Sequence, residues 1–203
     1  MLRRLRHWYG ELTKSRKPSY ELKTDIDKLM WSLEQRRGDM WNLSREAGQF
    51  VSILTKATGA KRILEIGCSN GYSAIWFSMG LPEDGKIITL EIDPKRAEEA
   101  RENWKRAGVS RKIQQMEGDA NQIIPTLEGP FDLVLLDAKK EDYFPQFKMI
   151  YPKVKTGGII LADNVIGHAQ HMQDYLQYVR NHPDLESVTL PLGDGMELTY
   201  KKK

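Results

Sequence analysis

Residues 62–73 read RILEIGCSNGYS, and they form the most informative stretch of the chain. Its first part is a short apolar run, which predicts a buried strand over Arg62–Gly67. Gly67 and Gly71 then permit a tight turn and a close approach of the backbone to a ligand. The apolar segment that follows predicts a helix over Gly71–Met79. A strand, a glycine turn and a helix in this order indicate the start of an α/β unit.

The same alternation continues towards the C-terminus. Further strands are predicted over Lys86–Ile92, Lys112–Glu117, Phe131–Asp137 and Gly158–Asp163. Helices are predicted between and after them, over Pro94–Ala107, Ala120–Leu127, Asp142–Val154 and Ala169–Asn181. The turn PLGDG at 191–195 joins two last strands, Glu186–Leu190 and Met196–Lys201. The predicted fold class is therefore α/β: a doubly wound, Rossmann-like sheet, mostly parallel, with an antiparallel C-terminal hairpin strand.

The segment before this alternation reads as helical. Apolar residues at helical spacing predict one helix over Tyr20–Gln35 and a second over Ser44–Thr58, with Ser44 as the N-cap and Gly59 as the stop. We expect a single domain over 1–203, made of a helical N-terminal extension (1–58) and a Rossmann-like core (59–203).

Length and composition limit the class of protein. The chain has 203 residues, 40% of them hydrophobic and 29% charged, which is typical of one globular domain. Its single cysteine, Cys68, forms no disulfide framework, and no apolar run approaches the ~20 residues of a membrane helix. No signal peptide is visible at the N-terminus, so we expect a cytoplasmic location.

The formal net charge is +3, and basic residues gather at both ends of the chain. Residues 1–18 hold six of them against Glu11, and Lys201, Lys202 and Lys203 close the chain. Such an arm can attract nucleic acid, but a solvated, frayed terminus is the more common role, and it is the one we favour here.

Three features of the predicted sheet favour a nucleoside ligand. The glycine turn places a helix N-terminus, with free N–H groups, beyond the first strand. Glu91 ends the second strand, where a carboxylate can accept both hydroxyls of a ribose, and Gly118-Asp119-Ala120 ends the third. A nicotinamide-dependent oxidoreductase is the alternative on this fold. The turn argues against it, because Ser69 stands where the dinucleotide motif has its central glycine.

Oxygen-bearing side chains follow the fourth and fifth strands. Asp137 ends one, and Asp163 and Asn164 end the other. Neighbouring strands lie about 4.8 Å apart, so we expect these oxygens to meet at one edge and to bind Mg²⁺, with Mn²⁺ or Ca²⁺ as alternatives. Lys140 lies three residues past Asp137. A nearby dication disfavours its ammonium form, so it becomes a candidate general base.

These motifs resemble the class I S-adenosylmethionine (SAM) methyltransferases, and within them the cation-dependent caffeoyl-CoA and catechol O-methyltransferases. The resemblance is carried by Asp137-Ala138-x-Lys140-x-x-Tyr143 and Ala162-Asp163-Asn164-Val165, and is supported by Glu46–Phe50 and Asp194-Gly195. It implies that Ser73 binds the SAM carboxylate, Glu91 the ribose and Ala120 the adenine. The full implied SAM-binding set is Leu43, Glu65, Gly67, Cys68, Gly71, Ser73, Glu91, Asp119, Ala120 and Asp137. The implied metal ligands are Asp137, Asp163 and Asn164, with Lys140 and Asp137 as catalytic residues.

The resemblance also implies a reaction and partners. We expect methyl transfer from SAM to a hydroxyl of a vicinal-diol aromatic acceptor, chelated by a divalent cation, in a homodimer. The alternatives are a tRNA hydroxyuridine O-methyltransferase of the same family and a non-catalytic SAM-binding module. Trp41 is a candidate for the acceptor pocket. Glu197 lies near the position of the carboxylate that meets the second hydroxyl in catechol enzymes, but in a different register.

Overall fold

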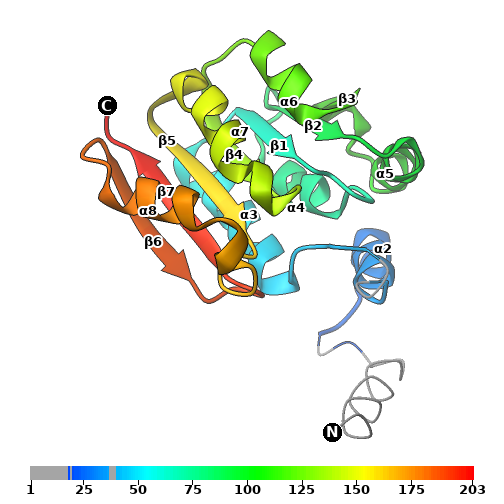
Figure 1. Ribbon diagram of the computed structural model, residues 1–203. Coiled ribbons are helices and arrows are strands. Elements are labelled where there is room, and N and C mark those ends of the chain that lie inside the picture. The colour runs from blue at the N-terminus through cyan, green and yellow to red at the C-terminus, as the bar shows by residue number, and fades with distance from the viewer. Residues whose placement is uncertain (1–17, 19, 37–39) are drawn as a thin grey trace, which may run out of the picture.

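A seven-stranded sheet forms the centre of the protein in a computed structural model, which describes residues 18, 20–36 and 40–203. The strand order is β3-β2-β1-β4-β5-β7-β6, and only the contacts of β7 are antiparallel (Figure 1). The strands are β1 (Arg62–Ile66), β2 (Lys86–Glu91), β3 (Ile113–Glu117), β4 (Phe131–Leu136), β5 (Val154–Asp163), β6 (Leu185–Leu190) and β7 (Met196–Lys201). The predicted fold class is confirmed.

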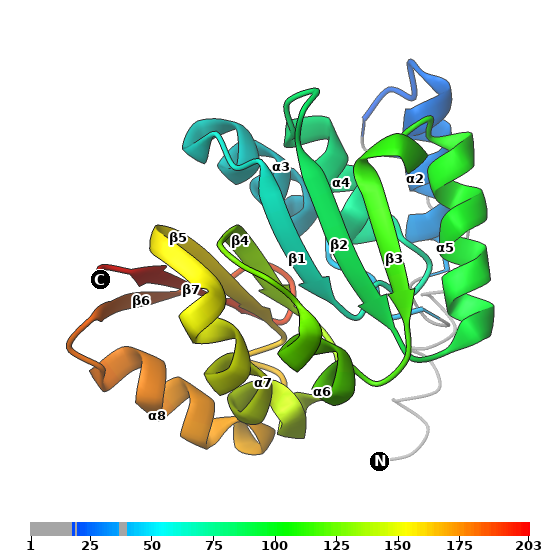
Figure 2. The ribbon, with the colours of Figure 1, turned by 90° about the horizontal axis from the view of Figure 1, so that it is seen from above.

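Helices cover both faces of this sheet (Figure 2). One layer contains α2 (Asp25–Glu34), α3 (Arg45–Thr58), α4 (Tyr72–Gly80) and α5 (Pro94–Arg106). The other contains α6 (Ala120–Ile123), α7 (Tyr143–Ile150) and α8 (Gln173–Asn181). Each layer packs its own cluster of buried apolar side chains against the sheet, so the strands are covered on both sides. This explains their nearly continuous apolar sequences.

Side-chain caps begin four of the seven α-helices in the described ranges. Ser44 caps α3 through its side chain and Gly59 ends it in the left-handed conformation, as predicted. The first predicted helix is shorter than expected. The Thr24 side chain accepts a hydrogen bond from the Asp27 amide in a capping box, so α2 begins at Asp25 instead of Tyr20.

The predicted helix over Asp142–Val154 is wrong at its C-terminal end. α7 stops at Ile150, a 3₁₀ turn over Tyr151–Lys153 follows, and β5 begins at Val154. The strand was predicted to begin at Gly158, four residues later. In the structure Gly157, with φ +79°, lies within the strand, at a register irregularity between β4 and β5. The glycines therefore mark a bulge and not a strand end.

The register of β4 and β5 determines the position of the predicted acidic edge. Leu136 of β4 pairs with Ala162 of β5, so Asp137 and Asp163 follow at the same level of the sheet. β7 then inserts between β5 and β6, pairing Met196 with Asp163. The carboxyl ends of β1, β2, β4 and β5 all lie at one edge.

None of the helices in the described ranges is long and apolar enough to cross a membrane. The basic arm over residues 1–17 lies outside the described residues. The division into an extension (1–58) and a core (59–203) stays a prediction.

Candidate active site

The glycine turn between β1 and α4 requires its glycines for packing within the chain. Gly67 and Gly71 have φ angles of +89° and +84°. A side chain at Gly67 would overlap the backbone carbonyl of Asp137, and one at Gly71 would overlap the Trp104 ring. The turn therefore lies directly against the end of β4 and against α5. This contact inside the protein accounts for the glycines independently of any ligand.

Glu91 at the end of β2 holds the turn in place. Its Oε2 accepts a hydrogen bond from the Ser69 amide at 2.8 Å, and its Oε1 accepts from the amides of Ile92 and Asp93 at 3.0 Å each. A carboxylate offers about four lone-pair positions, so about one remains. That Glu91 accepts the hydroxyls of a ribose stays a prediction. The role of Ser69 was missed, because a backbone amide has no sequence signal.

Glu65 and Asn70 bring unpartnered polar atoms to the same turn. Glu65 is fully buried on β1; the Thr89 hydroxyl donates to its Oε2 at 2.6 Å, and its Oε1 has no partner. Burial raises the pKa of Glu65 to about 7, while the Ser73 hydroxyl lowers it. Asn70 is also fully buried, and neither side-chain amide atom is hydrogen-bonded. Since unpaired buried polar atoms are rare, a polar group of a ligand fits here. Asn70 was not among the residues predicted from the sequence.

The other predicted cofactor residues differ in their exposure. Cys68 and Leu43 are buried, and burial raises the pKa of the Cys68 thiol, so their side chains belong to the core. Asp119 accepts a hydrogen bond from the Asn121 amide at 2.8 Å and caps α6, which begins at Ala120. These two positions are half-buried. The structure thus brings the ends of β1, β2 and β3 together around one turn.

Asp137 and Asp163 form a buried acidic pair beside the turn. The Asp137 side chain is 9% exposed, and Asp163 is 5% exposed. Burial raises the pKa of both carboxyl groups, and the Asp137 carboxylate raises that of Asp163 further. Asn164 follows in the left-handed conformation, with φ +64°, which asparagine tolerates better than most residues. All three residues lie at the predicted edge.

Lys140 is buried against this pair. It begins a 3₁₀ turn over Lys140–Asp142, between β4 and α7. Its Nζ lies 3.1 Å from Asp137 Oδ1 and donates a hydrogen bond to the Tyr143 hydroxyl at 2.8 Å. The Tyr143 hydroxyl in turn donates to the backbone carbonyl of Asp163 at 3.1 Å. Lys139, its neighbour in sequence, is exposed.

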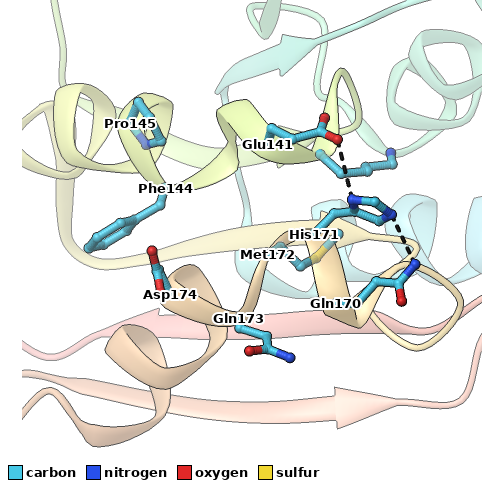
Figure 3. Close-up of a pocket in the computed structure, with 9 residues that line it drawn as sticks. Glu141, Phe144, Pro145, Gln170, His171, Met172, Gln173 and Asp174 are labelled. Carbon is cyan, nitrogen blue, oxygen red and sulfur yellow. Dashed lines mark hydrogen bonds and ion pairs between the residues drawn. The ribbon is translucent and has the colours of Figure 1, made fainter.

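Two cavities flank these residues. One of about 250 Å³ is lined by Trp41, Asn42, Asn164, His168 and Asp194. The other, of about 350 Å³, lies between the Lys140 segment and the start of α8 (Figure 3). Glu141 and His171 lie 3.3 Å apart in its lining, and they form an ion pair when the imidazole is protonated. Neither cavity is lined by residues of the glycine turn.

Glu197 does not belong to this site. It is fully buried on β7 and makes two hydrogen bonds with Arg180 of α8, at 2.8 and 2.9 Å. Thr189 donates to the same carboxylate at 2.5 Å. The Glu197 side chain is therefore committed to the hairpin, and it offers no carboxylate to an acceptor.

The donor atoms at the ends of β4 and β5 determine which metal ion could bind there. In residues 18, 20–36 and 40–203, no group of three or more His, Cys, Asp or Glu side chains is placed to hold a metal ion. The predicted set has two carboxylates and one amide. Two buried carboxylates that repel each other, next to an amide oxygen, suit a hard divalent cation. The residues present fit such an ion.

A doubly wound sheet with a glycine turn after β1 and an acid at the end of β2 defines a nucleoside-binding α/β protein of the Rossmann-like class. The sequence model of a family described as O-methyltransferase matches residues 17–202, which is nearly the whole chain. The chain belongs to this O-methyltransferase family.

Known relatives agree with this assignment. Catechol O-methyltransferase of Mycobacterium tuberculosis is 36% identical over 160 residues, covering 73% of each chain. Caffeoyl-CoA O-methyltransferase 5 of Nicotiana tabacum is 32% identical over 185 residues, covering 78% of this chain and 77% of the relative. The crystal structure of the O-methyltransferase TomG from Streptomyces achromogenes, in complex with SAM, superimposes with a TM-score of 0.79. It is 26% identical and covers 98% of this chain and 96% of TomG. The chain is a SAM-dependent O-methyltransferase.

Proposed function

We propose that the protein transfers the methyl group of SAM to one hydroxyl of an aromatic vicinal diol, of the catechol or caffeoyl type, with a divalent cation as cofactor. The observation that carries this proposal is the buried acidic pair Asp137 and Asp163, with Lys140 beside it, at the end of the strand that contacts the glycine turn. A pair of buried acids costs stability unless a cation compensates them, so a functional role explains their placement.

The glycine turn and the ends of β2 and β3 would hold SAM. Glu65 and Asn70 offer unpartnered buried atoms, and Glu91 retains about one free acceptor position. Ser73, in the first turn of α4, and the half-buried Asp119-Ala120 segment complete the proposed set. The backbones of Leu43, Gly67, Cys68 and Gly71, more than their side chains, would face the cofactor. When bound, SAM supplies a methyl group on a positively charged sulfur.

Asp137, Asp163 and Asn164 would hold the cation. When bound, a divalent cation supplies Lewis acidity, which lowers the pKa of a phenolic hydroxyl from about 10 and orients it. Two vicinal oxygens allow bidentate binding, whereas a lone hydroxyl does not. This preference for adjacent hydroxyls supports a catechol or caffeoyl acceptor.

Lys140, as the neutral amine that a neighbouring dication would favour, would take the proton of the reacting hydroxyl and become an ammonium ion. Its Nζ is held at the acidic edge by Asp137 and is almost withdrawn from solvent, at 6% exposure for the residue. A positioned base of this kind contributes about 10²–10⁴-fold to a rate. Trp41, which is 68% exposed and lines the cavity that Asn164 also lines, would provide an apolar wall for the aromatic ring.

A methyl-transfer assay tests this function directly. The full chain is incubated with labelled SAM and, in parallel, with catechol, a hydroxycinnamoyl-CoA ester or bulk tRNA, each with Mg²⁺ or with a chelator. We expect methylation of a small-molecule diol that is lost in chelator. Methylation of tRNA alone would replace the acceptor, and undiminished activity in chelator would remove the cation. SAM binding without transfer to any acceptor would favour a binding module.

Three further features stay predictions: a homodimer, a cytoplasmic location and a single domain made of an extension and a core. Sedimentation of the full chain measures its mass in solution and so tests the homodimer. Limited proteolysis between residues 58 and 59 tests the division into an extension and a core.

A further inference from the structure

We propose that Tyr143 is a positioning residue for methyl transfer, which aims the Lys140 amine at the acceptor hydroxyl through a buried hydrogen-bond chain. The inference rests on the proposed role of Lys140 as the base. Tyr143 is the first residue of α7 and comes from a different element than the two strand ends that it connects.

The hydrogen bonds of the Tyr143 hydroxyl have a defined direction. Its oxygen accepts from Lys140 Nζ at 2.8 Å, and its single proton goes to the backbone carbonyl of Asp163 at 3.1 Å. A hydroxyl has one proton to donate, and here the carbonyl takes it. A lone pair of the Tyr143 oxygen is thereby directed at Lys140. The chain therefore ties the base to the end of β5, beside the proposed metal ligands.

Two hydrogen bonds fix the orientation of the Lys140 nitrogen. Nζ is tetrahedral, and one of its four positions is the bond to its own side chain. Asp137 Oδ1, at 3.1 Å, and the Tyr143 hydroxyl, at 2.8 Å, take two more. One position remains, and it is the one available to an acceptor hydroxyl. Without the Tyr143 hydroxyl two positions would be free, and the long lysine side chain could rotate about the contact with Asp137.

The Tyr143 ring is itself held firmly. It is fully buried, and Tyr175 of α8 packs edge-on against it with ring centroids 6.0 Å apart. A further contact of the Lys140 segment joins Glu141 to His171 (Figure 3). That pair is about half exposed on both sides, so it restrains little. Tyr143 is thus, with Asp137, one of two buried restraints on the base.

Tyr175 offers a matched control for removal of the hydroxyl. It is as deeply buried as Tyr143, but its hydroxyl has no hydrogen-bond partner in the described structure. Tyr143→Phe and Tyr175→Phe each delete one buried oxygen from the same aromatic cluster. Only the first deletion touches Lys140.

The test compares both variants with the unmodified chain, using catechol as acceptor and Mg²⁺. For Tyr143→Phe we expect kcat to fall about tenfold, while the KM for catechol and the calorimetric Kd for SAM stay within twofold. Tyr175→Phe should leave all three unchanged. Either of two results would overturn the proposal: an unchanged kcat in Tyr143→Phe, or an equal loss of kcat in Tyr175→Phe. A loss of SAM binding in Tyr143→Phe would also overturn it, because it would show that Tyr143 has a structural role.

A double-mutant cycle separates this inference from the proposed function. If Tyr143 acts only through Lys140, Tyr143→Phe should have no further effect on kcat in a Lys140→Ala background. The same tenfold loss in that background would refute positioning. If Lys140→Ala itself leaves kcat unchanged, or if the unmodified chain methylates no diol, the proposed function fails first.

Discussion

Because Glu65 is buried, we expect the free energy of unfolding of the protein to fall as the pH rises from acidic to neutral. The pKa of this carboxyl rises from its ordinary 4.5 to about 7 because the residue is fully buried on β1. Each pKa unit corresponds to about 1.4 kcal/mol, so ionised Glu65 lowers the free energy of unfolding by about 3 kcal/mol relative to neutral Glu65.

The sign follows from the direction of the pKa change. The folded state keeps the proton more tightly than the unfolded state. The contribution of neutral Glu65 to the free energy of unfolding is therefore fully present below pH 4.5. It falls as the pH rises and is lost above about 7. Glu65→Gln removes the titration, yet its carbonyl oxygen can still accept the hydrogen bond from Thr89.

Urea unfolding of the unmodified chain and Glu65→Gln at pH 5 and pH 8, without SAM or metal, measures this difference. We expect Glu65→Gln to gain stability relative to the unmodified chain between the two pH values, by about 2 kcal/mol. Glu102→Gln, at an exposed carboxylate on α5, controls for the loss of a charge. A gap between the two proteins that is the same at both pH values would refute the reasoning.

Three other substitutions test separate parts of the structure. Asp163→Ala should abolish metal-dependent transfer, by about 100-fold or more, while calorimetry finds SAM affinity within twofold; retained activity would exclude Asp163 as a ligand. Glu91→Ala removes the acceptor of three backbone amides, so SAM affinity should fall about tenfold or more, and an unchanged Kd would contradict this assignment. Arg180→Ala leaves the Glu197 carboxylate buried without its partner, so the free energy of urea unfolding should fall by about 2 kcal/mol. This is less than the roughly 3–5 kcal/mol typical of a broken buried ion pair, because the Arg180 side chain is 44% exposed. A smaller loss in Arg180→Ala than in Glu197→Gln would contradict the claim that the unpaired carboxylate causes the loss.

The candidate site was predictable where strand ends carry polar residues. Asp137, Asp163 and Asn164 follow apolar runs, and parallel strands bring their carboxyl ends to one edge. The predicted juxtaposition is therefore what the register of β4 and β5 produces. Ser69, Asn70 and Tyr143 were not predicted in their roles. A backbone amide, an unpaired side chain and a hydroxyl in a motif look ordinary until their neighbours in space are known.

The position of Glu197 could not be predicted from the sequence either. In sequence, Glu197 lies near the position of the second-hydroxyl carboxylate of catechol enzymes, but in a different register, so it was not among the predicted site residues. In the structure, Arg180, Ser187 and Thr189 all meet its carboxylate. Side chains alternate between the two faces of a strand, so one step of register determines which face a residue occupies.

Local sequence was enough for the order of strands and helices, the glycine turn, and the acids at the strand ends, because periodicity, capping and chain stiffness act within a few residues. The insertion of β7 between β5 and β6, the contact of Gly67 with Asp137, and the chain from Lys140 through Tyr143 to Asp163 depend on tertiary structure. These features join elements far apart in the sequence, and only the packing of both helical layers on the sheet sets their distances.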